Sequence, residues 1–532
     1  MSDRIRVIPF GEMLKKLLTE YRENKTLYGV KPDRSHSHIP IGPAAGPHTQ
    51  LAGNIVAAYA TGASVIELKT VQILEGEELQ LKKPCIYTKG AVFNTEWSAE
   101  LKVVESLYEF IKAYILIHIL SKEFQLGDPT KVQFIMSVGY DLTGIQSEKV
   151  DYFIEHMKHA ATTQEWQEDI QFLIQHIDWF TRVKSKDIKE LQDVISNTVT
   201  LSTMHGCKAS EIEKIAAYLI KDKKCNTFVK MNPTLIGLEE TKAILKEKGY
   251  EEYSFDPAIF AKDITLDMAV SICCNLQEHA RKYQKKFGIK MTNTFPVLIQ
   301  KQELAGREMY MSGPPLYALS IKAAALLAQR TEGSIPISYS GGADGDNIET
   351  ILNTGISAVT VSSVLLKQGG YRQIATMQKR AAGYQQKGSL DVAALLAVAG
   401  QSAGDIHYHK KETASFPKAD KYSEFCAKCK NCVDVCPNRA NIRLETEKGT
   451  YVIHRDRLCN ECGNCAFFCV MGHVPYLEKF TLFEQEEDYD TSENDGILYT
   501  KEKKICRRHG YEGYAPEELI SLITDAYQKG NV

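Results

Sequence analysis

No apolar run in this sequence is long enough to cross a membrane. The best candidate, from Ala113 to Leu120, falls well short of the roughly 18 apolar residues that a transmembrane helix needs, and Lys112 and Lys122 flank it. We interpret this run as part of a buried helix. The first residues of the chain also lack the apolar core of a secretory signal, because charged residues interrupt them. We therefore expect a cytoplasmic protein.

The chain carries little net charge for its length. Its 532 residues sum to a formal net charge of -3, and its shares of 44% hydrophobic and 25% charged residues are ordinary for a globular protein. A net charge so close to zero gives no general attraction to nucleic acid or to an anionic membrane surface, and we expect neither as a partner. The length exceeds what one ordinary hydrophobic core needs, so we expect two or more structural units.

Cysteine is concentrated in one segment. Eight of the 14 cysteines fall between positions 426 and 469, which indicates a metal site and not the disulfide framework of a short secreted protein. Two runs in this segment have the spacing C-x-x-C-x-x-C-x-x-x-C, which is the spacing of bacterial ferredoxins. The ligands that we predict are Cys426, Cys429, Cys432, Cys436, Cys459, Cys462, Cys465 and Cys469.

The same spacing predicts how these ligands divide between two [4Fe–4S] clusters. Three cysteines of one run wrap a cluster, and the fourth binds the other cluster. Two zinc sites are the alternative, but zinc needs four ligands and no third cysteine at this spacing. Cluster one would then be held by Cys426, Cys429, Cys432 and Cys469, and cluster two by Cys459, Cys462, Cys465 and Cys436. Outside the pattern, we expect buried thiols at Cys85, Cys225, Cys273, Cys274 and Cys506.

The residues before the cysteines alternate short apolar runs with stretches of helical spacing. Strands that alternate with helices predict a parallel sheet, and eight such units match an α/β fold of the (β/α)8 barrel type. The predicted strands are Ile39–Ala45, Ser64–Thr70, Val132–Ser137, Asn197–Thr203, Thr227–Pro233, Lys290–Phe295, Ile335–Gly341 and Ser357–Ser363. We expect the barrel over 1–400 with an insertion at about 88–190, a linker over 401–420, the ferredoxin domain over 421–480 and a C-terminal extension over 481–532.

Polar and glycine residues follow the apolar part of most predicted strands, where barrel enzymes place their active sites. Gly341 and Gly342 follow the seventh strand, and Ser362 and Ser363 follow the eighth, which are the places where barrels bind phosphate. A glycine pair can also mark a simple turn. No G-x-G-x-x-G pattern follows any predicted strand, so the usual nicotinamide fingerprint is missing. A flavin exchanges both hydrides and single electrons, and we therefore expect FMN as the cofactor.

Short motifs in chain order carry a resemblance to a known family. They are GPAAGP at 42–47, ELKT at 67–70, FNTEW at 93–97, LSTMHG at 201–206, VKMNPT at 229–234, TNTF at 292–295, SGG at 340–342 and VSS at 361–363. The chain resembles the dihydroorotate and dihydropyrimidine dehydrogenase family, whose members have an FMN barrel and in part append a two-cluster ferredoxin domain. It resembles still more closely the selenate reductase subunits linked to purine catabolism, which share LSTMHGC and EMYMSG.

The resemblance implies roles for particular residues. Carboxamides and a carboxylate suit a ring of alternating N–H and C=O groups, because they supply both donors and acceptors. The implied substrate contacts are Asn94, Glu96, Asn293 and Thr294. The implied flavin contacts are Ala45, Gly46, Lys69, Thr70, Lys230, Ser312, Gly313, Gly341, Gly342, Ser362 and Ser363.

One motif departs from the family pattern. Pyrimidine-reducing relatives have N-L-S-C-P where this chain has Thr200 and Thr203, with Met204 in place of the proline. We therefore expect a substrate other than uracil. Thr203 occupies the proton-donor position, and His205 and Cys207 are rival candidates that can equally be structural.

These expectations combine into one function and three rivals. We expect an FMN- and iron-sulfur-dependent oxidoreductase acting on an oxopurine, a urate-type ring or a related cyclic amide. Its clusters would exchange electrons with a partner subunit that binds FAD and uses NAD(P)H, in a homo- or hetero-oligomer. The rivals are an electron-transfer and scaffold subunit of a molybdenum enzyme acting on purines or selenate, a dihydropyrimidine dehydrogenase, and a literal selenate reductase.

Overall fold

A computed structural model describes most of the chain. The described residues are 5–33, 38–95, 98–204, 207–412, 416–418, 429–446, 449–508, 511–514 and 516–532. Three predicted site residues, Glu96, His205 and Cys426, lie outside them. Within the described ranges, none of the helices is both long and apolar enough to span a membrane.

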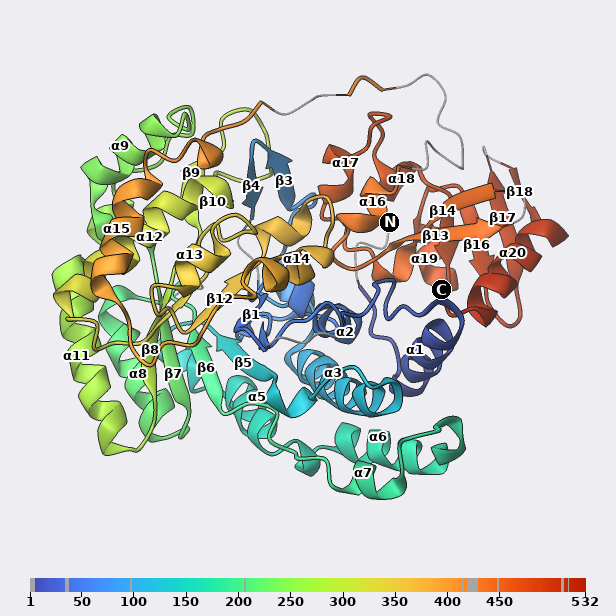
Figure 1. Cartoon of the computed structure of the whole chain (residues 1–532). Coiled ribbons are helices and arrows are strands. Elements are labelled where there is room, and N and C mark those ends of the chain that lie inside the picture. Colours follow the sequence, from blue (N-terminus) through green and yellow to red (C-terminus); the bar gives the residue numbers. More distant parts are fainter. Residues whose placement is uncertain are drawn as a thin grey trace.

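Eight parallel strands form the barrel that the sequence predicts (Figure 1). Each of them overlaps one of the eight predicted runs, and their order around the sheet is β1-β12-β11-β8-β7-β6-β5-β2. The ends of the sheet meet where the Ser64 N–H donates to the Ile41 carbonyl at 3.0 Å. The strands are β1 (Ile41–Pro43), β2 (Val65–Glu67), β5 (Gln133–Val138), β6 (Thr198–Leu201), β7 (Asn226–Met231), β8 (Phe287–Met291), β11 (Ile337–Tyr339) and β12 (Ala358–Val361).

Closure of the barrel depends on a glycine. A Cβ atom at Gly42 on β1 would lie 1.6 Å from the carbonyl oxygen of Val65 on β2, so any side chain there would separate the two strands. The short strands read as apolar runs because both of their faces are buried, one by the barrel interior and one by the surrounding helices.

Helices cover the outside of the barrel, as expected for alternating strands and helices. The run Ala113–Leu120 lies in α3 and is almost wholly buried, which confirms its interpretation as part of a buried helix. The longer helices of this layer are α2 (Ala52–Ala60), α3 (Val103–Phe124), α5 (Glu148–Lys158), α8 (Ile212–Lys221), α9 (Leu238–Glu247), α11 (Leu266–Lys282), α12 (Pro314–Arg330), α14 (Arg372–Arg380) and α15 (Val392–Ser402).

The segment from 88 to 190, expected as an insertion, contains several kinds of element. One of them, β5, is a strand of the barrel itself. Two helices, α6 (Gln164–Gln175) and α7 (Ser185–Lys189), lie outside the barrel layer at the bottom of Figure 1. Its first strand, β4 (Ala91–Asn94), belongs to a second sheet.

That second sheet is antiparallel and has the order β3-β4-β10-β9. It joins β3 (Ile86–Lys89) and β4 to β9 (Phe295–Leu298) and β10 (Glu308–Ser312). The run Lys290–Phe295 was predicted as one strand, but the chain leaves the barrel after Met291 and starts β9 at Phe295. The residues between these two strands therefore form a loop at the barrel mouth.

The C-terminal part of the chain is built on a six-stranded sheet. Its strands follow each other in chain order, from β13 to β18, and β15 is parallel to both of its neighbours. The segment beyond 481, expected as an extension, continues this sheet and adds α20 (Glu517–Gln528), whose Leu519 and Ile523 pack on it. The strands are β13 (Asn441–Thr446), β14 (Gly449–Arg455), β15 (Thr481–Phe483), β16 (Gly496–Tyr499), β17 (Lys504–Arg508) and β18 (Tyr511–Tyr514).

Asn464 joins the cysteine-rich segment to the barrel. Its side chain is fully buried, and its Nδ2 donates to the carbonyls of Leu366 and Val435 at 2.8 Å each. Its Oδ1 accepts a hydrogen bond from the Thr88 hydroxyl at 2.8 Å. One carboxamide thus satisfies groups on the barrel, on the second sheet and on the first cysteine run.

We predict that Asn464→Leu lowers the free energy of unfolding by about 3 kcal/mol, because it leaves two carbonyls and a hydroxyl buried without partners. Thr88→Val removes only one of these bonds and should cost about 1 kcal/mol. Chemical denaturation of the full chain measures both values. An equal loss in the two variants would show that Asn464 is not the centre of this junction.

Candidate functional site

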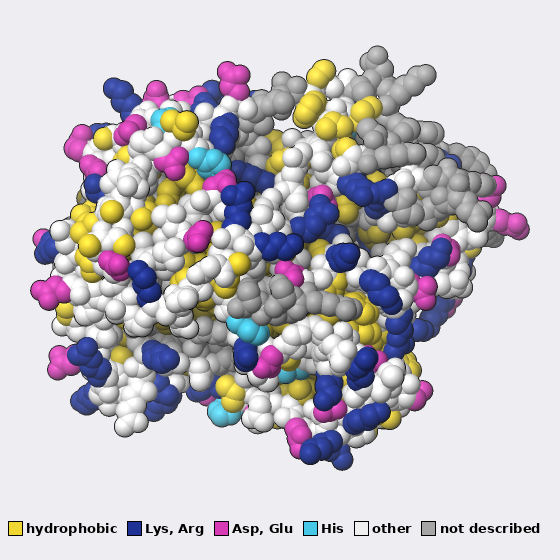
Figure 2. Space-filling model, viewed as in Figure 1, with side chains coloured by type: hydrophobic (Ala, Val, Ile, Leu, Met, Phe, Trp, Pro, Cys, Tyr) yellow, Lys and Arg dark blue, Asp and Glu magenta, His cyan; other side chains and the backbone are white. Residues whose placement is uncertain are grey.

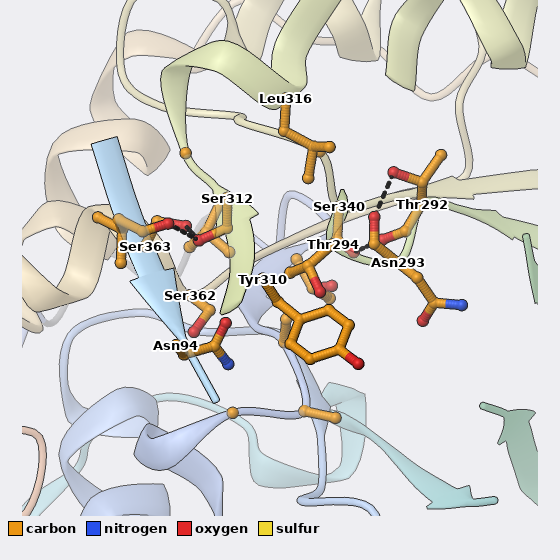
Figure 3. Close-up of a pocket in the computed structure, with 18 of the residues that line it drawn as sticks. Asn94, Thr292, Asn293, Thr294, Tyr310, Ser312, Leu316, Ser340, Ser362 and Ser363 are labelled. Atoms are coloured by element: carbon orange, nitrogen blue, oxygen red, sulfur yellow. Dashed lines mark hydrogen bonds between the residues drawn. The ribbon is translucent and has the colours of Figure 1, made fainter. Parts of the chain in front are cut away.

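A pocket opens at the carboxyl ends of the barrel strands (Figure 3). About 1030 Å³ in it is free of atoms, part of it open to solvent. The second sheet supplies one wall through Ile86, Asn94 and Tyr310. All eleven residues predicted to contact flavin line this pocket, and so do Asn94, Asn293 and Thr294. The structure therefore brings these residues together, while their roles stay predictions.

Two further predicted residues lie beside this pocket. Thr203 and Cys207 line an adjoining hollow, which shares Met204, Thr294 and Tyr310 with the main pocket. Burial raises the pKa of the Cys207 thiol to about 12, so this thiol stays protonated at neutral pH. The arrangement gives Cys207 no activated thiolate.

Glycines let four loops meet at one end of the pocket. A Cβ atom at Gly342 would lie 2.5 Å from the carbonyl oxygen of Gly313, and one at Gly46 would lie 2.6 Å from the hydroxyl of Ser362. Gly342 also has a positive φ of 70°, which favours glycine. The hydroxyl of Ser363 bonds to that of Ser312 at 3.1 Å across the gap. Glycines at positions 46 and 342 allow the neighbouring loops to approach this closely. The narrow end of the pocket that they form suits a phosphate group.

Buried charges lie under the pocket. Glu67 pairs with Lys290 at 2.9 Å, and both side chains are almost inaccessible. The same carboxylate oxygen accepts a hydrogen bond from the Ala45 N–H at 3.2 Å. Burial would raise the pKa of Glu67, but the charges of Lys290 and Lys230 outweigh it and lower that pKa. Glu67 therefore stays ionised inside the barrel.

The lysines that line the pocket differ in exposure, because Lys69 is buried and Lys230 is half-buried. Burial lowers the pKa of Lys69 to about 8, and desolvation also lowers the pKa of Lys230. An anionic group in the pocket would favour the charged form of each lysine. Both lysines were predicted as flavin contacts, whereas Lys290 was not predicted as a site residue. Its signal in the sequence is a charge within an otherwise apolar strand.

We predict that Lys290→Met lowers the free energy of unfolding by about 3–5 kcal/mol at pH 7, because Glu67 loses its closest counter-charge. Glu67 normally has a lowered pKa, so its contribution is present above its ordinary pKa of about 4.3 and lost below the folded value. In the variant, burial raises that pKa, so the deficit should shrink as the pH falls.

The double variant Lys290→Met/Glu67→Gln removes both charges and should recover most of the loss. Urea denaturation at pH 7 and pH 5 measures all three proteins. A single variant whose deficit is the same at both pH values would contradict this account.

Four polar side chains from different loops form a chain beside the pocket. The Thr203 hydroxyl donates to the Lys230 carbonyl at 2.8 Å and accepts from the Nδ2 of Asn293 at 2.9 Å. The same Nδ2 donates to the Oδ1 of Asn232 at 2.6 Å. The Nδ2 of Asn232 donates to Asp263 at 2.7 Å. Thr203, the predicted proton donor, thus directs its proton to the backbone.

Neither Asn232 nor Asp263 was predicted from the sequence. Asn232 lies within the VKMNPT motif and directly follows β7, so its position at a strand end could have indicated a role. Asp263 follows the short helix α10 (Ile259–Lys262) and carries no comparable signal.

The second cysteine run packs against the wall of the pocket. The N–H groups of Cys85 and Ile86 both donate to the Cys462 carbonyl, at 3.2 and 2.9 Å. Cys462 shares a buried apolar cluster with Cys85, Ile86, Val92 and Leu366, and the last three of these also line the pocket.

The predicted ligands of cluster two lie near one another. Burial raises the pKa of Cys459 well above its usual value, and the neighbouring Cys436, Cys465 and Cys462 raise it further. The sulfur atoms of Cys436 and Cys459 each accept a backbone N–H at 3.3 Å. Of the predicted cluster-one ligands, Cys432 is buried, Cys469 is half-buried and Cys429 is exposed.

The cysteines outside the two runs are mostly buried, as expected. Cys85, Cys225, Cys273 and Cys506 are buried, whereas Cys274 is exposed. The prediction for Cys274 was wrong because it lies on the outer side of α11, next to the buried Cys273.

A basic hollow lies near the first cysteine run. Lys16, Arg372, Lys430, Arg439 and Arg443 line it, together with Glu20 and Asp434. Figure 2 shows lysine and arginine side chains along the middle of the molecule, where α14 and α16 (Asn431–Asp434) lie in Figure 1.

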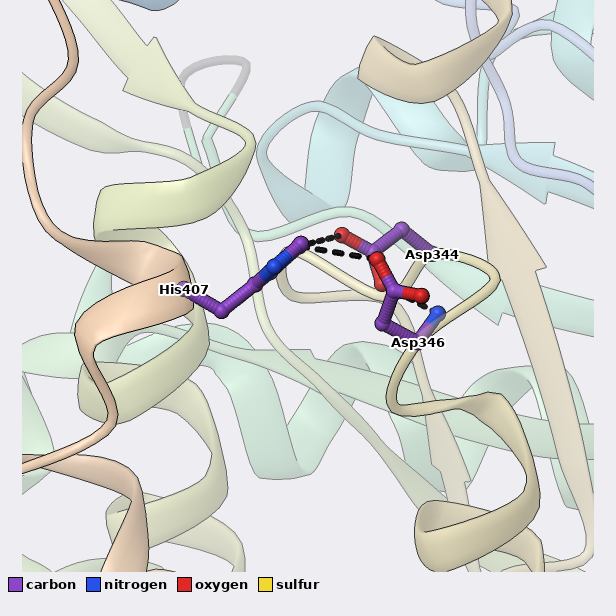
Figure 4. Close-up of side chains that lie close together, drawn as sticks. All are labelled: Asp344, Asp346 and His407. Carbon is purple, nitrogen blue, oxygen red and sulfur yellow. Dashed lines mark hydrogen bonds and ion pairs between the residues drawn. The ribbon is translucent and has the colours of Figure 1, made fainter.

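The segment expected as a linker is fastened to the barrel (Figure 4). His407 lies 2.9 Å from Asp346 and 3.7 Å from Asp344, in the loop that follows β11. The hydroxyl of Tyr408 donates to Asp344 at 3.2 Å. These contacts hold the loop that carries Gly341 and Gly342.

Comparisons with known proteins give one family and several relatives. The family described as "Oxidoreductase YgfK, N-terminal TIM-barrel domain" matches residues 14–410. Proteins named "Putative oxidoreductase YgfK" from Escherichia coli strains K12 and O157:H7 are each 39% identical over 412 residues, which cover 72% of this chain and 39% of the relative. The chain thus spans about two fifths of the length of these relatives.

Two solved structures of DHODH from Eimeria tenella are similar to this chain. The ligand-free form has a TM-score of 0.40 and 15% identity, covering 74% of this chain and 97% of that one. The form in complex with ferulenol has a TM-score of 0.38 and 15% identity, covering 74% and 91%.

Proposed function

The chain belongs to the family of the oxidoreductase YgfK N-terminal TIM-barrel domain, and from this premise we propose that it is an FMN- and iron-sulfur-dependent oxidoreductase. The substrate would be an oxopurine or a related cyclic amide, and the setting would be purine catabolism in the cytoplasm. The observation that carries the proposal is the shared wall between the barrel pocket and Cys462.

The pocket supports FMN through its shape and its charge. Glycines narrow one end enough for a phosphate group, as barrels do after their seventh and eighth strands. Lys69 is buried and Lys230 is half-buried at the pocket, and desolvation lowers the pKa of both. Bound FMN would supply hydride transfer, while these two lysines would place positive charge beside it and favour its anionic form.

The cysteine geometry supports iron-sulfur clusters over zinc. Three cysteines at two-residue spacing can wrap one cubane, whereas a zinc site needs no third cysteine at this spacing. The backbone N–H groups that face the sulfur atoms of Cys436 and Cys459 also suit a cubane, because hydrogen bonds to the sulfurs are typical of such clusters.

The position of the runs suggests the order of electron transfer. Cys462, a predicted ligand of cluster two, touches the same apolar residues that line the pocket. Cys429, a predicted ligand of cluster one, is exposed. Electrons would therefore pass between the pocket and cluster two, and then between cluster two and cluster one, which faces outward.

The basic hollow suggests where a partner binds. Its lining includes Lys430, the residue after Cys429, and Arg439, which follows the last cysteine of the first run. A reductase subunit that binds FAD and uses NAD(P)H would complete the enzyme, and an acidic surface on it would match this hollow.

We predict that Cys462→Ala lowers the iron content of the purified protein by about half while flavin is retained, because it removes one ligand of one cluster. Cys85→Ala is the matched control, since Cys85 is buried in the same apolar cluster but is not a predicted ligand. Iron, sulfide and flavin analyses measure the outcome. Zinc in place of iron, or equal losses in both variants, would overturn the proposed clusters.

One observation favours the rival in which the chain only transfers electrons. The proton of Thr203 points to the Lys230 carbonyl and not into the pocket. Under this rival the barrel would bind flavin without turning over a ring.

A reoxidation screen decides between the two functions. The full chain, purified anaerobically, is reduced with dithionite, and the flavin spectrum is followed as oxopurines and cyclic imides are added. We expect at least one ring to restore the oxidised spectrum. If none does while flavin and clusters are both present, the electron-transfer role replaces the enzyme.

A further inference from the structure

The hydrogen-bond chain beside the pocket ends on a carboxylate. Asp263 accepts from the Nδ2 of Asn232 at 2.7 Å, from the Thr234 hydroxyl at 2.5 Å and from the Ile264 N–H at 2.8 Å. Three donors around one side chain match an ionised carboxylate, which accepts hydrogen bonds and cannot donate them. The direction of the hydrogen bonds at this end of the series is therefore fixed.

The orientation of each carboxamide in this series fixes the orientation of the next. Asn232 must turn its NH₂ group to Asp263, so it turns its carbonyl oxygen to Asn293. Asn293 then uses both protons of its NH₂ group, one for Asn232 and one for Thr203. A carboxamide that spends its NH₂ group in this way has only its oxygen left to offer.

The oxygen of Asn293 is turned toward the pocket. In Figure 3 the nitrogen of Asn293 points away from Tyr310, and its oxygen lies on the side of that ring. Across the pocket, the Oδ1 of Asn94 is buried and has no hydrogen-bond partner among the described residues. Asn293 thus presents an acceptor to a bound molecule, and a buried acceptor without a donor is costly.

We propose that Asp263 is a positioning residue that sets the hydrogen-bond polarity of Asn293, so that the pocket selects rings with an N–H group on the edge facing Asn293. The inference rests on the proposed function, because it names the substrate class of the same site. Cyclic imides and ureides with an unsubstituted nitrogen at that edge fit, whereas a ring with an N-alkyl group there would leave the acceptor without a donor.

The test compares two probes, xanthine and 1,3-dimethylxanthine, through their effect on the flavin absorption spectrum of the full holoprotein. We expect the wild type to bind xanthine at least about tenfold more tightly, because the site is built to accept hydrogen bonds. In Asp263→Asn the preference should fall to about threefold or less, because Asn232 and Asn293 can then turn over and present their NH₂ groups.

A double variant that exchanges the residues at positions 263 and 232 distinguishes an effect on hydrogen-bond polarity from an effect on packing. In Asp263→Asn/Asn232→Asp the new carboxylate at position 232 again faces Asn293 as an acceptor, so the wild-type preference should return. Asp267→Asn is the control, because Asp267 is exposed and pairs with Arg330 outside the pocket. It should leave the preference unchanged.

The possible results distinguish the proposed role of Asp263 from the proposed cofactor. An unchanged preference in Asp263→Asn, a swap that does not restore it, or a flavin-loaded wild type that binds neither probe would overturn the role of Asp263. Protein purified without flavin would contradict the proposed cofactor instead. Calorimetric titration of the flavin-free protein with the same two probes would then measure its preference between them.

Discussion

The Cys462 carbonyl fixes how the two halves of the molecule meet. It accepts backbone hydrogen bonds from Cys85 and Ile86, at the start of the sheet that walls the barrel mouth. The N–H groups of Cys85 and Ile86 belong to the backbone at the start of β3, so they cannot shift without disturbing that strand. This contact therefore sets the distance between the pocket and the second cysteine run. Asn464, two residues further on, adds bonds to both sides. The proposed relay depends on this junction.

Charge inside the barrel supports the same arrangement. Lys69 and Lys290 are buried at or below the pocket, Lys230 is half-buried there, and Glu67 pairs directly with Lys290. A buried positive charge is stabilised by a nearby negative charge, and an anionic cofactor would add one. The proposed FMN would thus favour the charged forms of the lysines that line the pocket.

Much of the barrel could be predicted because its strands are short, continuous apolar runs. For example, β12 (Ala358–Val361) lies inside the predicted run Ser357–Ser363, and its polar serines follow it as expected. The strand β8 was harder to place. Lys290 interrupts the apolar run, and its burial makes sense only beside Glu67, which is more than two hundred positions earlier. Sequence spacing carries no sign of such a pair.

The site residues divide in the same way. Residues within strand-end motifs, such as Ser362 and Lys230, line the pocket, and their contacts with flavin stay predictions. Asp263 follows no strand, and its contacts with Asn232, and through it with Asn293 and Thr203, join four separate loops. Only the folded barrel brings these loops together, so the direction of their hydrogen bonds could not be predicted.

We propose that a flavin in the barrel exchanges electrons with the cysteine-bound clusters of the same chain. Laser-flash reduction of the anaerobic holoprotein, followed at flavin and cluster absorbance, measures this transfer. We expect electrons to pass from flavin to cluster at a rate that does not depend on protein concentration. Transfer that scales with concentration, or no transfer at all, would contradict it.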